Sequence, residues 1–153
     1  MKKSNFIYLF VLLAGMVCLD ACKKKEDPAP SKKELLVGTS SKKWKVTSAT
    51  DPLGRNAIPE AFPRECDRDN LLVFYTDNKL VIEEGAVQCN PPTVAQGSWR
   101  LSTDEKALTI NVPGSVLNGD FTIIEMTNTT LKGTFPYNYQ GTPVTINATL
   151  TAQ

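Results

Sequence analysis

Few residues in this chain could carry out chemistry, because it contains no histidine. Histidine is the general base of Ser-His-Asp and Cys-His arrangements and a common ligand of zinc. Its absence excludes both of these catalytic arrangements and zinc sites that use histidine as a ligand. The chain has four cysteines but no C-x-x-C spacing of the kind that redox pairs use. Carboxylates are therefore the remaining candidates for catalysis.

Two pairs of carboxylates lie close together in the sequence. Glu83 and Glu84 are adjacent, so on a strand they would point to opposite faces and could not act on one substrate. Asp67 and Asp69 would share a face, as a calcium site or a catalytic dyad requires. Their loop lacks the glycine and the terminal glutamate of an EF-hand, and we interpret it as the solvated entrance to a hairpin. We expect no enzymatic activity, no metal site and no cofactor.

The stretch from Cys66 to Cys89 predicts a β-hairpin. The apolar runs Leu71–Tyr75 and Leu80–Ile82 flank a short Asp/Asn turn, and these residues tolerate the backbone of tight turns. With a two-residue turn at Asp77–Asn78, the two cysteines would face each other across the ladder. A three-residue turn with a bulge would shift the register by one residue.

The N-terminus has the features of a secretion signal. Lys2 and Lys3 precede the apolar run Phe6–Val17, which is too short to span a membrane comfortably. The run ends in Leu19-Asp20-Ala21-Cys22, which resembles the lipobox of bacterial lipoproteins. This resemblance implies that Cys22 is lipidated and anchors the protein to a membrane. The alternative is a plain signal peptide that happens to end near a cysteine.

Three segments follow from this interpretation: a lipoprotein signal peptide (1–21), the lipidated cysteine with a flexible tether (22–34), and one domain (35–153). The tether is rich in lysine and proline, as an extended spacer is. We expect the protein in the cell envelope, with the outer membrane favoured, either facing the periplasm or exposed at the surface.

The same interpretation accounts for all four cysteines. Cys18 leaves with the signal peptide and Cys22 carries lipid, so one pair remains outside the cytoplasm. Because disulfides persist in such compartments, we expect Cys66 and Cys89 to be bonded.

From residue 35 onward the sequence predicts about eight short strands. Several segments alternate apolar and polar residues, as strands do when one face packs on a core and the other meets water. The clearest are Trp44–Ser48, Ser98–Leu101, Leu108–Val112 and Val144–Leu150. No helix of ordinary length is expected, although Glu34–Leu36 could make one short turn. This pattern favours an antiparallel barrel or sandwich, and in a barrel the proline-rich segment Pro52–Arg64 would lie across one mouth.

Five segments resemble, in order and spacing, the lipocalin-like domain of small Gram-negative bacterial lipoproteins. They are Leu35–Gly38, Trp44–Ser48, Cys66–Asn70, Gly97–Leu101 and Thr127–Leu131. The resemblance implies an up-and-down barrel of about eight strands, a tryptophan at its floor, and an interior that holds a small apolar ligand.

The aromatic residues divide into two groups. Five are expected inside the barrel, where they either fill a solid core or line a cup for an apolar ligand. They are Trp44, Phe74, Trp99, Phe121 and Phe135. Tyr137 and Tyr139 lie in a late loop, where they either contact a glycan or protein partner or pack over the barrel end.

Charge excludes one class of partner. Without residues 1–21 the chain keeps 15 basic and 15 acidic residues. They form no basic stripe, so we expect no nucleic-acid partner. The favoured hypothesis is a membrane-anchored protein that binds a small apolar ligand without catalysis, and the alternative is a glycan- or protein-interaction module with a solid core.

Overall fold

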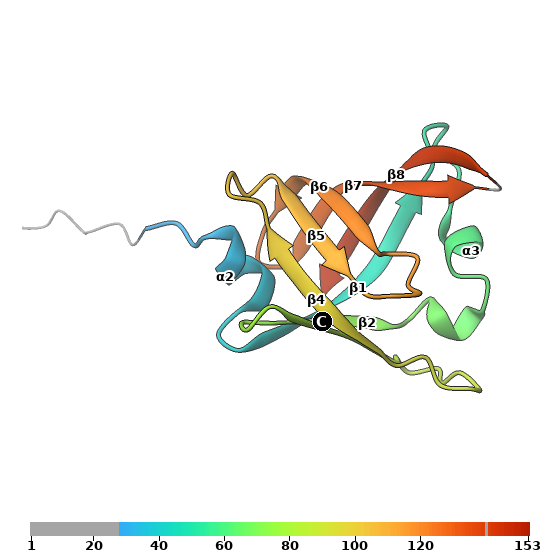
Figure 1. Ribbon diagram of the computed structural model, residues 1–153, viewed down its shortest axis with the longest axis horizontal. Helices are drawn as coiled ribbons and strands as arrows, with labels where there is room; N and C mark the ends of the chain where they lie inside the picture. Colours follow the sequence, from blue (N-terminus) through green and yellow to red (C-terminus); the bar gives the residue numbers. More distant parts are fainter. Residues whose placement is uncertain (1–27, 140) are drawn as a thin grey trace, which may run out of the picture.

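The computed structural model describes residues 28–139 and 141–153. The predicted signal peptide (1–21), the predicted lipidation site Cys22 and the first residues of the predicted tether lie outside these ranges. Within them, eight antiparallel strands form one closed barrel (Figure 1). They are β1 (Ser41–Thr50), β2 (Leu71–Tyr75), β3 (Lys79–Glu83), β4 (Ala95–Leu101), β5 (Ala107–Asn111), β6 (Gly119–Met126), β7 (Thr130–Tyr139) and β8 (Thr142–Ala152). The predicted all-β, up-and-down barrel is confirmed.

Each strand pairs with its successor along the chain, and β8 pairs with β1. Connections therefore alternate between the two ends of the barrel. The end next to the N-terminal helix α2 (Lys32–Val37) is the floor, and the opposite end, beside the short helix α3 (Ile58–Ala61), is the mouth (Figure 1). The two longest connections, residues 51–70 and 84–94, both lie at the mouth. As expected, the segment Pro52–Arg64 is part of this end.

Helix α2 covers the floor, and the sequence explains both of its ends. Ser31 and Glu34 form a capping box at its N-terminus, and Gly38 ends it with a φ of 63°. The buried indole of Trp44 donates a hydrogen bond from Nε1 to the carbonyl oxygen of Leu36 over 2.8 Å. This bond fixes the helix to the first strand.

The predicted helical turn at Glu34–Leu36 lies within α2, which is longer and begins at Lys32. Helix α2 therefore begins inside the segment 22–34 that the sequence assigns to a flexible tether. The reason is burial, since Leu36 and Val37 are at most 2% exposed and pack into the core.

Strands β2 and β3 form the predicted hairpin, but in the register of the three-residue turn. Phe74 pairs with Leu80 and Leu71 with Glu83, and Asn78 closes the turn with a φ of 69°. Asparagine adopts this left-handed conformation more readily than most residues do. The two-residue turn is therefore wrong. The prediction that Cys66 and Cys89 face each other across the ladder is also wrong, because the ladder ends at the Leu71–Glu83 pair.

The core is one cluster of apolar side chains from all eight strands and α2. Gly133 shows how closely its parts approach: a Cβ atom at this position would collide with the carbonyl oxygen of Thr122 and with the ring of Phe121. The neighbouring strand and the buried Phe121 ring occupy that space instead. Among the described residues, the barrel and its core cluster all lie within residues 32–153, so we expect this part of the chain to fold without the residues before it.

Candidate functional site

The two long connections at the mouth are joined by the disulfide between Cys66 and Cys89. Cys66 lies in the short 3₁₀ helix η1 (Glu65–Asp67), and Cys89 lies between β3 and β4. Their Cα atoms are 5.3 Å apart, within the range that a disulfide spans. The predicted disulfide is confirmed, although it links two loops rather than two paired strands.

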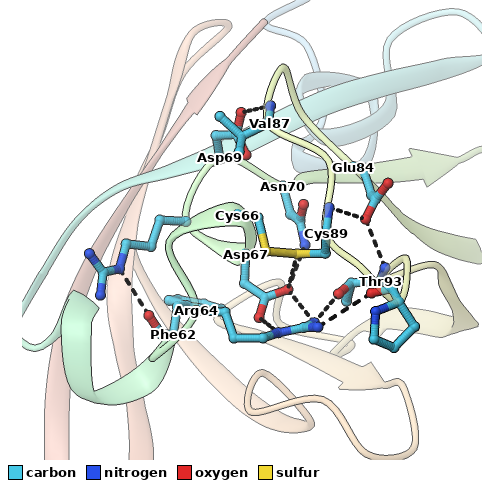
Figure 2. The surroundings of a disulfide bond; sticks show 12 residues. Phe62, Arg64, Cys66, Asp67, Asp69, Asn70, Glu84, Val87, Cys89 and Thr93 are labelled. Carbon is cyan, nitrogen blue, oxygen red and sulfur yellow. Dashed lines mark hydrogen bonds and ion pairs between the residues drawn. A yellow bond between two sulfur atoms is a disulfide. The ribbon is translucent and has the colours of Figure 1, made fainter.

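An ion pair lies beside this disulfide (Figure 2). Arg64 donates from Nε to Oδ2 of Asp67 over 2.8 Å and from Nη2 to Oδ1 over 2.9 Å. This fork holds the pKa of the Asp67 carboxyl below its usual value and raises the pKa of the Arg64 guanidinium. Arg64 also donates to Thr93 Oγ1 and to the carbonyl oxygen of Pro91, so it ties together both connections.

Two further carboxylates hold the connection between β3 and β4. Glu84 Oε1 accepts hydrogen bonds from the backbone N–H groups of Cys89 and Thr93, over 3.0 and 2.9 Å. Asp69 Oδ2 accepts from the N–H of Val87 over 2.9 Å. Asp67 and Asp69, which the sequence considers as a possible dyad, thus have separate structural partners. The mouth is a rigid frame built from side chains that bind backbone groups.

The disulfide-linked connections border an open cavity of about 310 Å³ at the barrel mouth, which we call the mouth cavity. Its lower wall comes from the barrel and α3, and its rim comes from the disulfide-linked connections and the connection between β5 and β6. The apolar part of the wall includes Val46, Ile58, Ala61, Phe62, Leu72, Ile82, Ala95, Val116 and Leu117. The polar part includes Arg64, Asp67, Arg68, Asn70, Thr93 and Ser115.

Below the mouth cavity, the interior of the barrel is almost filled. The inner void measures about 30 Å³ and is lined almost entirely by apolar side chains. Phe62, Leu72 and Leu117 line both this void and the mouth cavity, so they separate the two spaces. A cavity of a few hundred cubic ångströms therefore exists, but at the mouth rather than deep in the barrel.

The five aromatic residues expected inside the barrel are all buried there, at 9% exposure or less. Phe121 and Phe135 line the inner void. Phe74 and Trp99 pack edge to face with ring centroids 6.0 Å apart, and Trp44 binds the floor helix. None of the five lines the mouth cavity, so each fills core rather than the larger space.

Tyr137 and Tyr139 lie in strand β7 and not in a loop as expected, because β7 continues its pairing with β8 as far as Tyr139. They border a separate hollow of about 150 Å³ beside the loop that follows β1. Tyr137 is half-buried, and its hydroxyl donates to the carbonyl oxygen of Glu60 over 3.2 Å. Tyr139 is 42% exposed. Tyr137 therefore fits the alternative of packing over the barrel end. Tyr139 fits the other alternative, because its exposed ring is available to a glycan or protein partner.

Sequence reasoning missed Arg68 and Asn70 as wall residues of the mouth cavity, and it named Phe62 and Arg64 only as parts of a loop. The signal that could have found them is the proline-rich segment 52–64 followed one residue later by Cys66, because a disulfide at a barrel end holds nearby side chains in place. Their convergence with Thr93 and Leu117 depends on the closed barrel.

Within the described ranges, the only cluster of three side chains that could hold a metal ion is Cys66, Asp67 and Cys89, and its sulfurs are joined in the disulfide. Among the same residues, no helix is long and apolar enough to cross a membrane. No protein-family model and no curated protein sequence matches this chain.

Proposed function

We propose that this protein is a lipid-anchored, non-catalytic protein of the cell envelope that binds a small, partly apolar molecule at the mouth of its barrel. The observation that carries this proposal is the mouth cavity of about 310 Å³. This volume lies at the lower end of the range for small-molecule sites, which are concave, largely apolar and equipped with a few polar groups.

The mouth cavity is suited to binding because its walls are held in place before a ligand arrives. The disulfide, the Arg64–Asp67 pair and the bonds to Glu84 fix the rim. A rigid wall lowers the free-energy cost of ordering a site around its ligand.

The position of helix α2 supports a specific orientation. Helix α2 is at the floor, and α3 is at the opposite end of the barrel (Figure 1). The mouth cavity is lined by residues of α3 and of the connections at that opposite end. If Cys22 is the anchor, its tether joins the domain at the floor. The mouth cavity then opens away from the tether, toward the aqueous phase.

The binding proposal can be tested with N-phenyl-1-naphthylamine, a neutral apolar dye that fluoresces when it leaves water. A soluble chain of residues 28–153, made where the disulfide can form, should bind the dye with saturable fluorescence. Ala95 lines the mouth cavity from β4, so the variant Ala95→Phe should fill the space and abolish binding.

The matched control is Gln96→Phe, on the same strand. Gln96 is exposed and does not line the mouth cavity, so this variant adds the same ring on the other face and should bind the dye normally. Absence of dye binding by the unmodified domain, or equal binding by Ala95→Phe, would contradict the proposal. Native mass spectrometry of protein purified from its own cells would then identify the natural guest.

A second candidate function rests on Tyr139. Its exposed ring borders the hollow of about 150 Å³, together with Asp51, Arg55 and Glu60. An aromatic ring beside carboxylates is suited to stacking on a sugar, which favours glycan binding at this site. Tyr139→Ala should weaken retention on an immobilised glycan array, whereas a change at Ala95 should leave it unaltered.

A further inference from the structure

We propose that the molecule bound in the mouth cavity is a small amphipathic anion, and that Arg68 is the residue that recognises its negative group. This inference rests on the proposed function and adds the chemical class of the ligand. Three observations support it: the charge of the wall, the bonding of its two arginines, and the buried amide of Asn70.

The wall of the mouth cavity carries a net positive charge. Among the residues that line it, the charged ones are Arg64, Arg68 and Asp67. At the wall itself, two guanidinium groups therefore face one carboxylate, while Glu65 pairs with Arg68 at 3.8 Å from outside the lining. An anion in the cavity would meet more positive than negative charge at this wall. A cation would instead be repelled, because the wall has two positive side chains and one negative side chain.

The two arginines differ in how fully their donors are used. Arg64 makes a two-bond fork with Asp67 and also donates to Thr93 and Pro91. Its charge is thus neutralised by the frame of the mouth, and we assign it a structural role.

Arg68 has no comparable ionic partner in the described part of the chain. Its Nε and Nη2 atoms donate to the carbonyl oxygens of Phe62 and Pro63, which also line the mouth cavity. Its nearest carboxylate oxygen, on Glu65, is 3.8 Å away and belongs to a side chain that is 90% exposed. A guanidinium has five N–H donors in a planar fork that matches carboxylates, sulfonates and phosphates. Arg68 therefore keeps both charge and donors for a ligand.

Asn70 supplies an independent sign that the wall is completed by another molecule. Among the described residues, Asn70 is the one polar residue that is buried, at 8% exposure, and it lines the mouth cavity. Its Nδ2 donates to Asp67 Oδ1 over 3.3 Å, but its Oδ1 has no hydrogen-bond partner in the structure. Buried acceptors are nearly always paired, with water or with another group, so an N–H or O–H donor on a bound molecule would suit this oxygen.

The apolar wall indicates the rest of the ligand. Phe62, Leu72 and Leu117 lie between the mouth cavity and the inner void, so an apolar group placed against them would be removed from water. The expected ligand thus has a compact apolar body, one anionic group and one hydrogen-bond donor.

A matched pair of dyes tests this inference on residues 28–153. 1-Anilinonaphthalene-8-sulfonate and N-phenyl-1-naphthylamine share one ring system and one N–H group, and only the first carries a sulfonate. We expect the domain to bind the sulfonate about tenfold more tightly, as a charge-assisted hydrogen bond at a partly exposed site would give. Arg68→Gln should remove that preference, measured as the ratio of the two affinities in the same variant, so that both dyes bind about equally.

Two controls separate recognition by Arg68 from a general effect of charge or folding. Arg100→Gln removes an equal charge from β4 at a residue outside the mouth cavity, and it should keep the tenfold preference. Arg68→Lys retains the charge without the planar fork and should keep part of the preference. In the unmodified domain, the preference should also fall as sodium chloride screens the interaction.

The outcomes distinguish this inference from the proposed function. If the neutral dye binds in the mouth cavity but the sulfonate is not preferred, or if Arg68→Gln keeps the preference, recognition of an anion by Arg68 is overturned and the cavity remains a neutral binding site. If neither dye binds, both proposals fail. If Arg68→Gln does not fold, Arg68→Lys and the salt dependence of the unmodified domain decide the question.

Discussion

Arg64 donates from Nε to Oδ2 of Asp67 over 2.8 Å, and Asp67 directly follows the disulfide residue Cys66. Because Arg64 also reaches Thr93, the ion pair spans the same two connections that the disulfide joins. A covalent bond and a charged network therefore reinforce one another at the mouth. They differ in what breaks them, since the disulfide responds to reductants and the ion pair to pH.

Removing the disulfide should destabilise the domain. The closed loop contains about 24 residues, so the chain-entropy model gives a loss of about 3 kcal/mol for Cys66→Ser or Cys89→Ser. Urea unfolding measured by tryptophan fluorescence checks this value. The double variant should resemble each single variant, and a wild-type midpoint that does not move on adding reductant would contradict the prediction.

Stability should depend on pH through Asp67. Arg64 lowers the folded-state pKa of this carboxyl, so the ionised form stabilises the fold. That stabilisation is fully present above the unfolded-state pKa of about 3.9 and is lost as the pH falls through the lower folded-state pKa. Thermal unfolding between about pH 2 and pH 6 should show this loss. Asp67→Asn should make the unfolding temperature depend less on pH over this range. If the variant loses stability at low pH as the unmodified domain does, other carboxylates cause the loss.

Gly133 should not tolerate a side chain. A Cβ atom there meets the Thr122 carbonyl oxygen and the Phe121 ring, so Gly133→Val should cost about 3 kcal/mol or prevent folding. The control is Lys132→Val on the same strand, since Lys132 is exposed and its ion pair with Glu125 contributes little. Circular dichroism during thermal unfolding compares the two. Equal midpoints would show that β6 and β7 can separate without cost.

Trp44 should hold the floor helix. Trp44→Phe removes the N–H that binds the Leu36 carbonyl oxygen and leaves a buried acceptor without a partner, a loss of about 1–3 kcal/mol. Hydrogen exchange should increase in residues 32–37 more than in the strands. Uniform exchange across the domain would mean that α2 is held by its apolar contacts alone.

Replacing Cys22 tests the anchor. If this cysteine carries lipid, Cys22→Ser should move the protein from the membrane fraction to the soluble fraction of the cells. Cys18→Ser is the matched control, since that residue leaves with the signal peptide in our interpretation. A Cys22→Ser protein that stays in the membrane fraction would rule out lipid on Cys22 as the anchor.

The sequence by itself determined the strand content and the disulfide partners. Alternation of apolar and polar residues is a local property, so the segments around Trp44, Leu108 and Ile146 could be recognised as strands one at a time. The disulfide followed by elimination, because the lipoprotein interpretation assigns other roles to Cys18 and Cys22. The short floor helix could also be located, since Glu34–Leu36 lies within it.

Tertiary structure alone decided the register of the hairpin and the place of the cavity. The two possible turns at Asp77–Asn78 differ little in local preference, and pairing of the whole ladder selected the three-residue form. Whether a barrel is hollow depends on the summed volumes of side chains that are distant in sequence, such as Phe62, Leu72 and Leu117. Arg68 and Asn70 became wall residues only because barrel closure and the Cys66–Cys89 bond place them beside those apolar groups.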